Sequence, residues 1–395
     1  EEEDDDDEEE EEDDDDVDHG LGGRSDLRSL LSRGSLGDDD DDRDDADDSM
    51  APVSQARKQL TAGVASLSDR LERDEERIVC ASEMKLLLLR HWNVYESMYH
   101  SPFVASALNV WRQKGHEALL RLLAMVGISL VSAKQPYSMM PFKDKHALYP
   151  GLLEHGPALG LRELRFDSFY KKHGFQVEMS AADVALAVTA LLEEPYPEEE
   201  DMTDERAKEL REHNFWRAYD ATSPSESRIP RDMNSLLRTG VDAAINLQRA
   251  IVREASALSQ TDAIVIARTF HYAFLAETAD LVYFSRPLAL RKLALLLIEQ
   301  QPRSGTRKPL VLAARNHSSN SFLVVGVTGS DGGANTFGSM FEQAANKTKA
   351  ALRHQYFDST VIEMKRESIS KFMQYLMSLA ETPELQSPVR KRARV

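Results

Sequence analysis

The sequence is poor in cysteine, in long apolar runs and in motifs of common enzyme classes. Cys80 is its single cysteine, which excludes an internal disulfide and fits a reducing compartment. Apolar runs such as Leu86–Leu89 and Leu293–Ile298 are far shorter than the roughly 20 residues of a membrane-spanning helix. A P-loop, a His-Glu-x-x-His motif and a cysteine pair for zinc are all absent. We therefore expect no membrane span and no cofactor.

Charge is abundant but unevenly distributed. Residues 1–50 hold 27 Asp and Glu against 4 Arg, whereas the remaining residues hold 40 acids against 44 Lys and Arg. Self-repulsion and few apolar side chains predict that residues 1–53 form a disordered acidic tail. Within it, Leu27–Leu36 is a milder island that fits either a short binding helix or a plain linker.

Helical periodicity dominates the next segment. Apolar residues spaced by three and four predict one helix over residues 83–99 and a second over 101–126. Shorter helical pieces are expected over 143–154 and 161–170. Ser180 with Asp183 has the spacing of a capping box and predicts the start of another helix. We interpret residues 54–195 as an all-helical domain and residues 196–232 as a polar linker.

The period changes after the linker, where short apolar strands alternate with helices. Strands are predicted over 263–267, 281–284, 310–314, 322–327 and 360–364, and helices over 233–256, 287–299, 338–352 and 367–379. At one junction, Ser285 is expected to cap a helix that has Pro287 in its first turn. Residues 233–380 are therefore predicted to form a small α/β domain with a mixed sheet.

Basic residues gather near the predicted strand ends of this domain. Arg268, Arg286, Arg291 and Lys308 are the nucleic-acid-binding candidates, with Tyr272 and Tyr283 between them. Such a surface could follow a nucleic-acid backbone through salt-sensitive phosphate contacts. A merely solvated basic face is the alternative. The glycine-rich loop Ser330–Gly333 lacks a cation and is interpreted as a flexible loop rather than a phosphate site.

The carboxy-terminal tail, residues 381–395, ends in a basic cluster. Arg390, Lys391, Arg392 and Arg394 are candidates for a nuclear-import signal. Ser387 lies in a Ser-Pro-x-Arg pattern, which resembles a cyclin-dependent kinase site. A phosphate there would add negative charge beside the cations, so phosphorylation is expected to weaken import. The predicted location is the nucleus.

Several blocks along the chain resemble the cell division control protein 45 family. They are Arg90–Trp92, Asn109–Trp111, His173–Phe175, Ser180–Val184, Leu281–Leu297, Phe337–Ala345 and Phe357–Glu363, in this order. The family is similar to DHH-type phosphoesterases such as the exonuclease RecJ, and is generally considered inactive. The resemblance implies that the chain corresponds to the second half of a member, without the DHH domain. Residues 54–195 would then be a helical interdomain region, and residues 233–380 a DHH-associated domain.

The resemblance also implies a function. Family members are scaffold subunits of the replicative helicase, joining the minichromosome maintenance hexamer to the GINS complex during initiation and elongation. Replication initiation factors, DNA polymerases and single-stranded DNA are further expected partners. In active phosphoesterases a Gly-Gly-His loop binds substrate, whereas here Ala334 follows Gly332 and Gly333. The chain is therefore not expected to be an enzyme.

Two other functions stay open at this point. An active single-strand nuclease or phosphoesterase would need metal ligands in the DHH domain, which this sequence does not contain. A histone-binding chaperone is suggested by the acidic tail alone, and such tails also serve as solvated spacers. Trp92 and Trp111 are either docking residues or, as we prefer, core residues.

Overall fold

The computed structural model describes most of the chain from Ile78 to Ala380. The described ranges are 78–171, 179–196, 203–222, 230–261, 263–301, 307–316, 319–329, 335–354 and 358–380. Contacts divide the chain into Glu1–Arg70 and Leu71–Val395, and every described residue belongs to the second unit. The acidic tail, the glycine-rich loop 330–333 and the predicted import signal with Ser387 lie outside the described residues.

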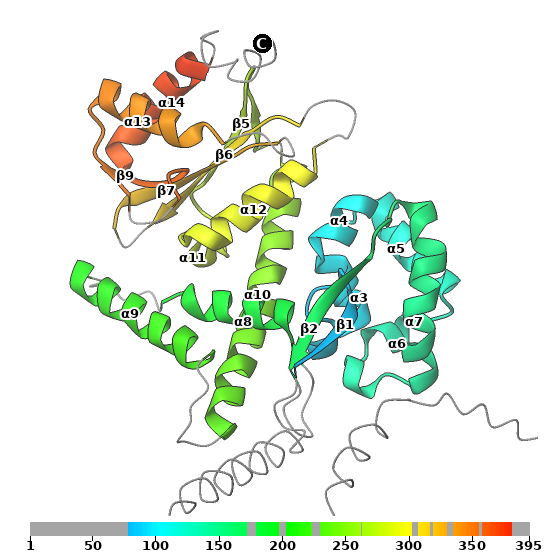
Figure 1. Ribbon diagram of the computed structural model, residues 1–395. Coiled ribbons are helices and arrows are strands. Elements are labelled where there is room, and N and C mark those ends of the chain that lie inside the picture. Colours follow the sequence, from blue (N-terminus) through cyan, green and yellow to red (C-terminus); the bar gives the residue numbers. More distant parts are fainter. Residues whose placement is uncertain are drawn as a thin grey trace, which may run out of the picture. The chain divides into compact units, whose positions relative to one another are not determined.

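The first part of this unit is mainly helical (Figure 1). Its helices are α3 (Val94–His100), α4 (Pro102–Leu108), α5 (Gln113–Met125), α6 (Leu130–Lys134), α7 (Phe142–His155) and α8 (Ala181–Leu192), with the 3-10 turns η3 (Leu89–His91), η4 (Tyr137–Met139) and η5 (Gly156–Leu159). They enclose an apolar core in which Met98, Leu119, Leu122 and Leu152 are completely buried. Burial of this core, more than local propensity, holds such short helices in place.

Polar side chains determine where several of these helices begin and end. The Oγ of Ser180 accepts a hydrogen bond from the backbone N–H of Asp183 at 3.1 Å, which confirms the predicted helix start. The helix predicted over 101–126 is instead two helices, because Asn109 adopts φ 58° and ends α4.

A three-stranded antiparallel sheet lies within the segment that we predicted to be all-helical. It consists of β1 (Ile78–Met84), β2 (Arg165–Lys171) and β3 (Met179–Ser180), in that order. Cys80 pairs with Phe169 in the register of β1 and β2. The helical predictions over 83–99 and 161–170 were therefore wrong in part. Strand β1 finds its partner β2 more than 80 residues further along the chain, a pairing that local periodicity does not reveal.

Two further helices follow. The predicted polar linker holds α9 (Asp204–Asp220), whose N-cap is Thr203. The 31-residue helix α10 (Pro230–Gln260) packs against α8, and Gly240 lies at this contact. A Cβ at Gly240 would lie 2.7 Å from the carbonyl oxygen of Ala187, so only glycine permits this helix contact.

The second part of the unit is an α/β structure around a mixed six-stranded sheet. The strand order is β4 (Val265–Ile266), β5 (His271–Leu275), β6 (Leu310–Asn316), β7 (Ser321–Val327), β9 (Val361–Lys365) and β8 (Leu352–Arg353). Only β5 and β6 pair in parallel; the other neighbours are antiparallel. This sheet confirms the predicted fold class.

Helices cover both faces of the sheet (Figure 1). On one face, α10, α11 (Leu281–Phe284) and α12 (Pro287–Glu299) enclose a core that contains Phe284, Leu290 and Leu312. On the other face, α13 (Phe337–Thr348) and α14 (Arg366–Ala380) pack on Val324 and Ile362. Strands buried on both faces read as continuous apolar runs, as β7 does.

The junction before α12 differs from the prediction. Residues 281–284 form the single-turn helix α11 rather than a strand, with Leu281 and Phe284 buried on its inner side. Ser285 does not cap α12, because its hydroxyl donates to the carbonyl oxygen of Val282; Arg286 occupies the N-cap position. Pro287 does stand in the first turn of α12, as predicted.

Trp92 is buried, as we preferred, and Trp111 is partly buried against the helical core. None of the helices in the described ranges is long and apolar enough to span a membrane.

Candidate nucleic-acid interface

The structure brings two of the four nucleic-acid-binding candidates to the same end of the sheet. Arg268 is exposed in the turn between β4 and β5, and Lys308 lies two residues before the start of β6. The Lys308 Nζ donates to the carbonyl oxygen of Ala267 at 3.1 Å, which fixes the cation beside this turn. His271 starts β5 at the same end; burial lowers its pKa, and the charge of Lys308 lowers it further. The imidazole is thereby kept neutral, and Arg268 and Lys308 supply the positive charge.

An aromatic row follows β5 away from these cations. The Tyr272 and Phe274 rings are 6.0 Å apart edge-to-face, and Phe274 stands in the same relation to Phe322 of β7. Val265 of β4 pairs with Tyr272 in the register. The side chain of Phe274 is 39% exposed, although its neighbours Ala273 and Leu275 are buried on the other face. At this edge, therefore, α13 and α14 leave part of the sheet uncovered.

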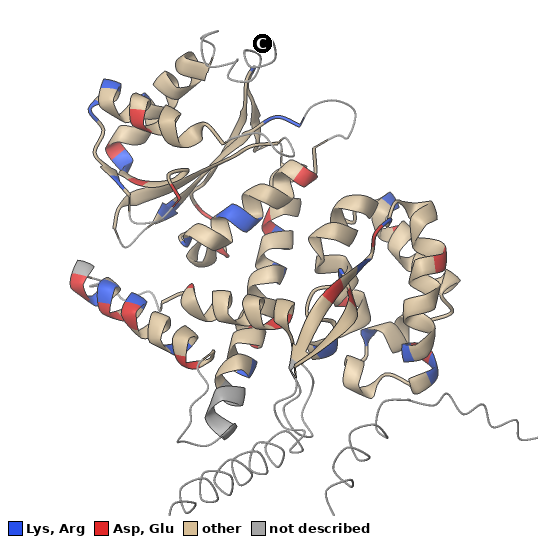
Figure 2. Ribbon diagram, in the orientation of Figure 1, with Lys and Arg blue, Asp and Glu red and all other residues tan. Residues whose placement is uncertain are grey.

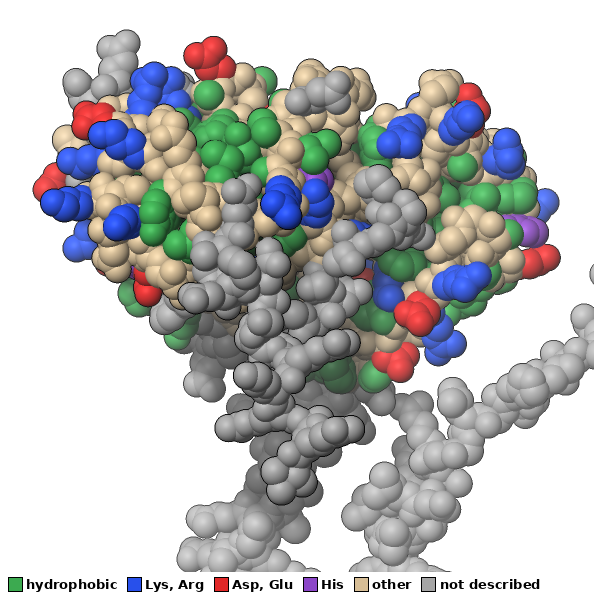
Figure 3. Space-filling view, turned by 90° about the horizontal axis from the view of Figure 1, so that it is seen from above, with side chains coloured by type: hydrophobic (Ala, Val, Ile, Leu, Met, Phe, Trp, Pro, Cys, Tyr) green, Lys and Arg blue, Asp and Glu red, His purple; other side chains and the backbone are tan. Residues whose placement is uncertain are grey.

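A third cation lies at the far end of the row. Arg315 is opposite Phe322 in the register of β6 and β7, and thus shares this face. Its Nε is buried and has no hydrogen-bond partner among the described residues. The row of aromatic side chains therefore has cations at both ends. Viewed from above, hydrophobic side chains lie between groups of Lys and Arg (Figure 3).

The chemistry of this surface suits single-stranded nucleic acid. An exposed ring such as Phe274 can stack on a base whatever the sequence, although Tyr272 is only partly exposed and Phe322 is buried. Lys or Arg near the row can contact the phosphates. Sequence reasoning identified Arg268, Lys308 and Tyr272, and it counted Arg315 among the basic residues near the strand ends, but it missed Phe274. The signal for Phe274 was the alternation of Tyr272 and Phe274 with small or aliphatic residues, which marks a strand that we did not predict.

The other two candidates make structural contacts elsewhere. The Arg286 guanidinium lies 3.8 Å from the centre of the Tyr196 ring, and Arg291 forms an ion pair with Asp358. Burial acts to raise the pKa of Asp358, but hydrogen bonds from Thr360 and the charge of Arg291 outweigh it and lower that pKa. Arg286 and Arg291 therefore contact an aromatic ring and a carboxylate of the chain itself, whereas Lys308 is held by a backbone carbonyl oxygen beside the exposed Arg268.

A buried polar cluster lies at the small sheet of the helical part. The His91 Nε2 is 3.3 Å from the Asp183 carboxylate, and the Arg90 guanidinium stacks 4.3 Å from the Tyr170 ring. Burial, aided by the negative charge of Glu83, raises the pKa of Tyr170 to about 12. Burial also raises the pKa of Glu83. This cluster joins β1, β2 and the start of α8, so its position is that of a structural network.

Metal binding has no support in the described part of the chain, where no group of three or more His, Cys, Asp or Glu side chains could hold an ion.

Comparisons with known proteins agree with this architecture. The CDC45 family model matches residues 53–379. The Cell division control protein 45 homologs of Dictyostelium discoideum and Schizosaccharomyces pombe are each 36% identical to the chain, over 78% and 76% of it. The human homolog is 30% identical over 78% of the chain. The matched regions are 47%, 52% and 53% of these relatives, so the chain spans about half their length.

The fold comparison points the same way. The crystal structure of CDC45 from Entamoeba histolytica matches with a TM-score of 0.60 and 24% identity, over 77% of this chain and 58% of that one. At this identity the match establishes the fold alone. The family model and the curated relatives establish the kinship, and the chain belongs to the cell division control protein 45 (CDC45) family.

Proposed function

We propose that this chain forms part of a non-catalytic scaffold subunit of the replicative DNA helicase, joining the minichromosome maintenance hexamer to GINS. Membership of the CDC45 family supports a role in cell division and DNA replication. Because the chain spans about half of its relatives, the activity belongs to the longer protein that contains it. In this scheme the hexamer hydrolyses ATP, while the scaffold holds the assembly together.

The observation that carries the proposal is an exposed aromatic cluster on α9. The side chains of Phe215, Trp216 and Tyr219 are each about half exposed, at 50%, 50% and 53%. Their rings contact one another, with centroids 5.3 to 6.4 Å apart. Aromatic residues are strongly enriched among those that dominate protein–protein binding energy. The α9 aromatic cluster is thus well suited to contact a partner protein.

Contacts on the other side of α9 hold the helix, and with it the aromatic cluster, in place. Asn214 is buried and its side-chain amide donates to the carbonyl oxygen of Glu194 at 3.0 Å, while Arg217 pairs with the Glu194 carboxylate. Ala218 is buried on the same side. At 100° per residue, the three aromatic residues lie on the opposite side of the helix. Charged residues are frequent in the first turns of α9 (Figure 2), and the aromatic cluster follows them.

The test is a pull-down from nuclear extract with the full-length protein that contains this chain. We expect the hexamer and GINS to be recovered together, and the double variant Trp216→Ala/Tyr219→Ala to lose at least one of them. Ile266→Ser is the matched control, since Ile266 is an exposed apolar residue outside α9. If the full-length protein recovers neither partner, the scaffold proposal is wrong. If the double variant also retains both partners, the scaffold role stands but α9 is not the contact surface.

Single-stranded DNA is proposed as the ligand of the sheet edge. The support is the aromatic row of Tyr272 and Phe274 between Arg268 with Lys308 at one end and Arg315 at the other. Contact with a strand emerging from the hexamer would not require base recognition. Replication initiation factors and DNA polymerases remain proposed partners.

Nuclear location is also a proposal, based on Arg390, Lys391, Arg392 and Arg394. Equal nuclear accumulation of Ser387→Ala and Ser387→Glu forms would reject the proposed control by Ser387.

An active DHH-type nuclease is the alternative function. A manganese-dependent cleavage assay with full-length protein separates the two, because a scaffold leaves single-stranded DNA intact.

A further inference from the structure

The segment from α6 to the start of α7 carries three of the most exposed large apolar side chains among the described residues. Ile266 of β4 is exposed to a similar degree. Val131, Met139 and Phe142 are 74%, 75% and 76% exposed. Single exposed apolar residues are ordinary, but three within the 12 consecutive residues that run from α6 through η4 to the start of α7 are not. We call these three residues the α6–α7 surface.

Local packing shows that this exposure belongs to a well-ordered turn. The hydroxyl of Ser129 caps α6 by accepting from the N–H of Ser132 at 3.1 Å. The Ser132 hydroxyl in turn donates to Asp144 at 2.5 Å, which ties α6 to the first turn of α7. Ala133 and Met140 are buried in the helical core on the inner side. The inner residues thus fix the turn, and the outer apolar residues contribute little to the core.

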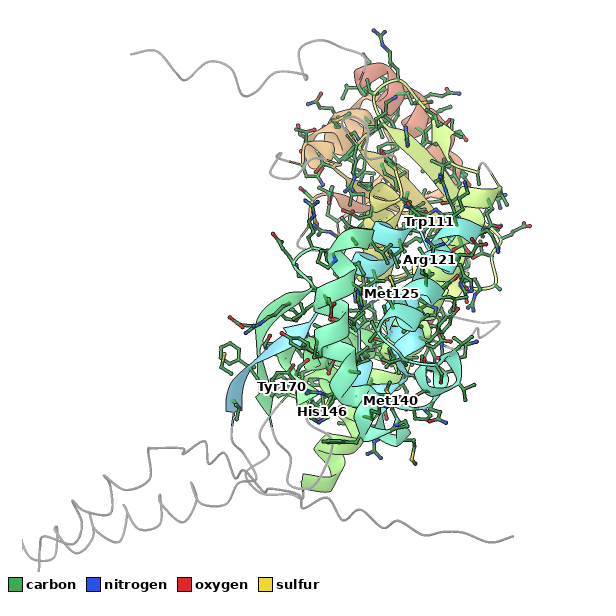
Figure 4. The ribbon with its side chains drawn as sticks, turned by 90° about the vertical axis from the view of Figure 1, so that its right-hand side faces the viewer. Trp111, Arg121, Met125, Met140, His146 and Tyr170 are labelled. Atoms are coloured by element: carbon green, nitrogen blue, oxygen red, sulfur yellow. The ribbon has the colours of Figure 1, made fainter. Side chains whose placement is uncertain are left out.

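Positive charge surrounds the α6–α7 surface. Lys134 and Lys143 are exposed, and the Lys145 Nζ donates to the carbonyl oxygen of Ser138 at 3.1 Å. His146 stacks on Phe142 with ring centroids 4.0 Å apart. Figure 4 labels His146, together with the buried Met140, on the helical part of the chain.

Negative charge is scarce in the same turn. Between Ser129 and Ala147 the only acidic residue is Asp144, and it already accepts the hydrogen bond from Ser132. The net charge that the turn presents to a partner is therefore positive.

We propose that the α6–α7 surface binds an acidic protein segment that carries large apolar side chains. Opposite charges would align the segment with Lys134, Lys143 and Lys145, and its apolar side chains would cover Val131, Met139 and Phe142. Nucleic acid fits this surface less well, since Val131 and Met139 are aliphatic and offer no ring for base stacking. The two features together select a peptide that is both acidic and apolar.

This inference deepens the scaffold role and rests on it only in choosing a protein as the ligand. Its test needs neither the hexamer nor GINS, so failure of one proposal is distinguishable from failure of the other.

The experiment measures fluorescence anisotropy of a labelled synthetic peptide, in which acidic residues alternate with Leu and Phe, on titration with full-length protein. We expect saturable binding that weakens as salt rises. Removing two apolar contacts in Met139→Ser/Phe142→Ser should weaken it at least about tenfold. Lys134→Glu/Lys143→Glu should weaken it by a similar factor and flatten the salt dependence.

Controls distinguish specific binding at this surface from non-specific apolar binding and from an effect of misfolding. Ile266→Ser removes an equally exposed apolar residue of β4 and should bind like the wild type. Thermal melts of both double variants should match the wild type, because the changed side chains are outside the core. A peptide with serine in place of Leu and Phe should bind weakly. Unchanged affinity of the Met139→Ser/Phe142→Ser variant, or equal binding of the serine peptide, would overturn the proposal.

Discussion

Glu193, at the end of α8, accepts a hydrogen bond from the backbone N–H of Leu288 at the start of α12, 95 residues further along the chain. Its second carboxylate oxygen accepts from the N–H of Ala289 at 2.9 Å. One carboxylate thereby satisfies two backbone donors of the first turn of α12, where no side chain of the local sequence forms a cap. The helical part and the α/β part are therefore joined by a helix cap supplied from a distant element.

Glu193→Ala should destabilise the protein by about 1 kcal/mol or slightly more, because it leaves two backbone N–H groups of the first turn of α12 without their acceptor. It also removes the negative charge near Lys292, whose pKa is already lowered by burial. Urea unfolding measures the effect. Glu194→Ala is a useful comparison, since it should loosen α9 rather than α12.

The same residue predicts a pH dependence. Burial, the largest effect, raises the pKa of Glu193 above its ordinary value, although the two backbone N–H groups oppose the rise. An acid whose pKa is raised on folding contributes stability that is present below the ordinary pKa and lost as the pH increases through the folded one. The unfolding free energy of the wild type, relative to Glu193→Gln, should therefore fall as the pH rises above about 4.5. A difference that stays constant or grows over this range would contradict the assignment.

Binding of single-stranded DNA should depend on the sheet edge and not on α12. We expect Arg268→Ala and Phe274→Ala each to weaken binding of an unstructured oligonucleotide about tenfold, by loss of a phosphate contact or a stacking ring. Arg291→Ala should leave binding unchanged but lower the melting temperature, because Arg291 pairs with Asp358. The reverse pattern would place the DNA on α12.

Contact between α8 and α10 should be intolerant of any side chain at Gly240. Gly240→Ala should destabilise the protein by about 1 to 3 kcal/mol, although alanine is the better helix former, because the new Cβ meets the backbone of Ala187. Arg238→Ala, at an exposed position of the same helix, should be nearly neutral in the same unfolding assay.

Local signals in the sequence were sufficient for much of this fold. The cap at Ser180, the buried run of β7 and the proline that opens α12 depend on residues close in sequence, and each was predicted from them. The strand β1 could not be predicted from local signals, because its partners in the sheet, such as Lys171 and Phe169, lie far along the chain. Residues 281–284 have strand propensity, but burial of Leu281 and Phe284 on one side makes them a helical turn.

The candidate sites also divide into features that residue type predicts and features that depend on tertiary contacts. Arg268, Lys308 and Tyr272 were recognised from residue type, yet nothing in the sequence distinguished them from Arg286 and Arg291, which have internal partners.

The surfaces were harder still to predict. The aromatic cluster of α9 was missed because its segment reads as a polar linker. Phe274 is exposed because the edge strand β4 is short and pairs only with His271 and Tyr272 of β5. The place of β5 in the sheet is set by its pairing with the distant strand β6.

The central claim is that the protein acts as a non-catalytic scaffold, and a reconstituted unwinding assay tests it most directly. The purified hexamer and GINS are incubated with ATP and forked DNA, with and without the full-length protein. The account predicts that efficient unwinding appears only when the protein is added, and that the DNA strands stay intact. Unwinding that is unaffected by the protein, or cleavage of the single strand by the protein alone, would contradict it.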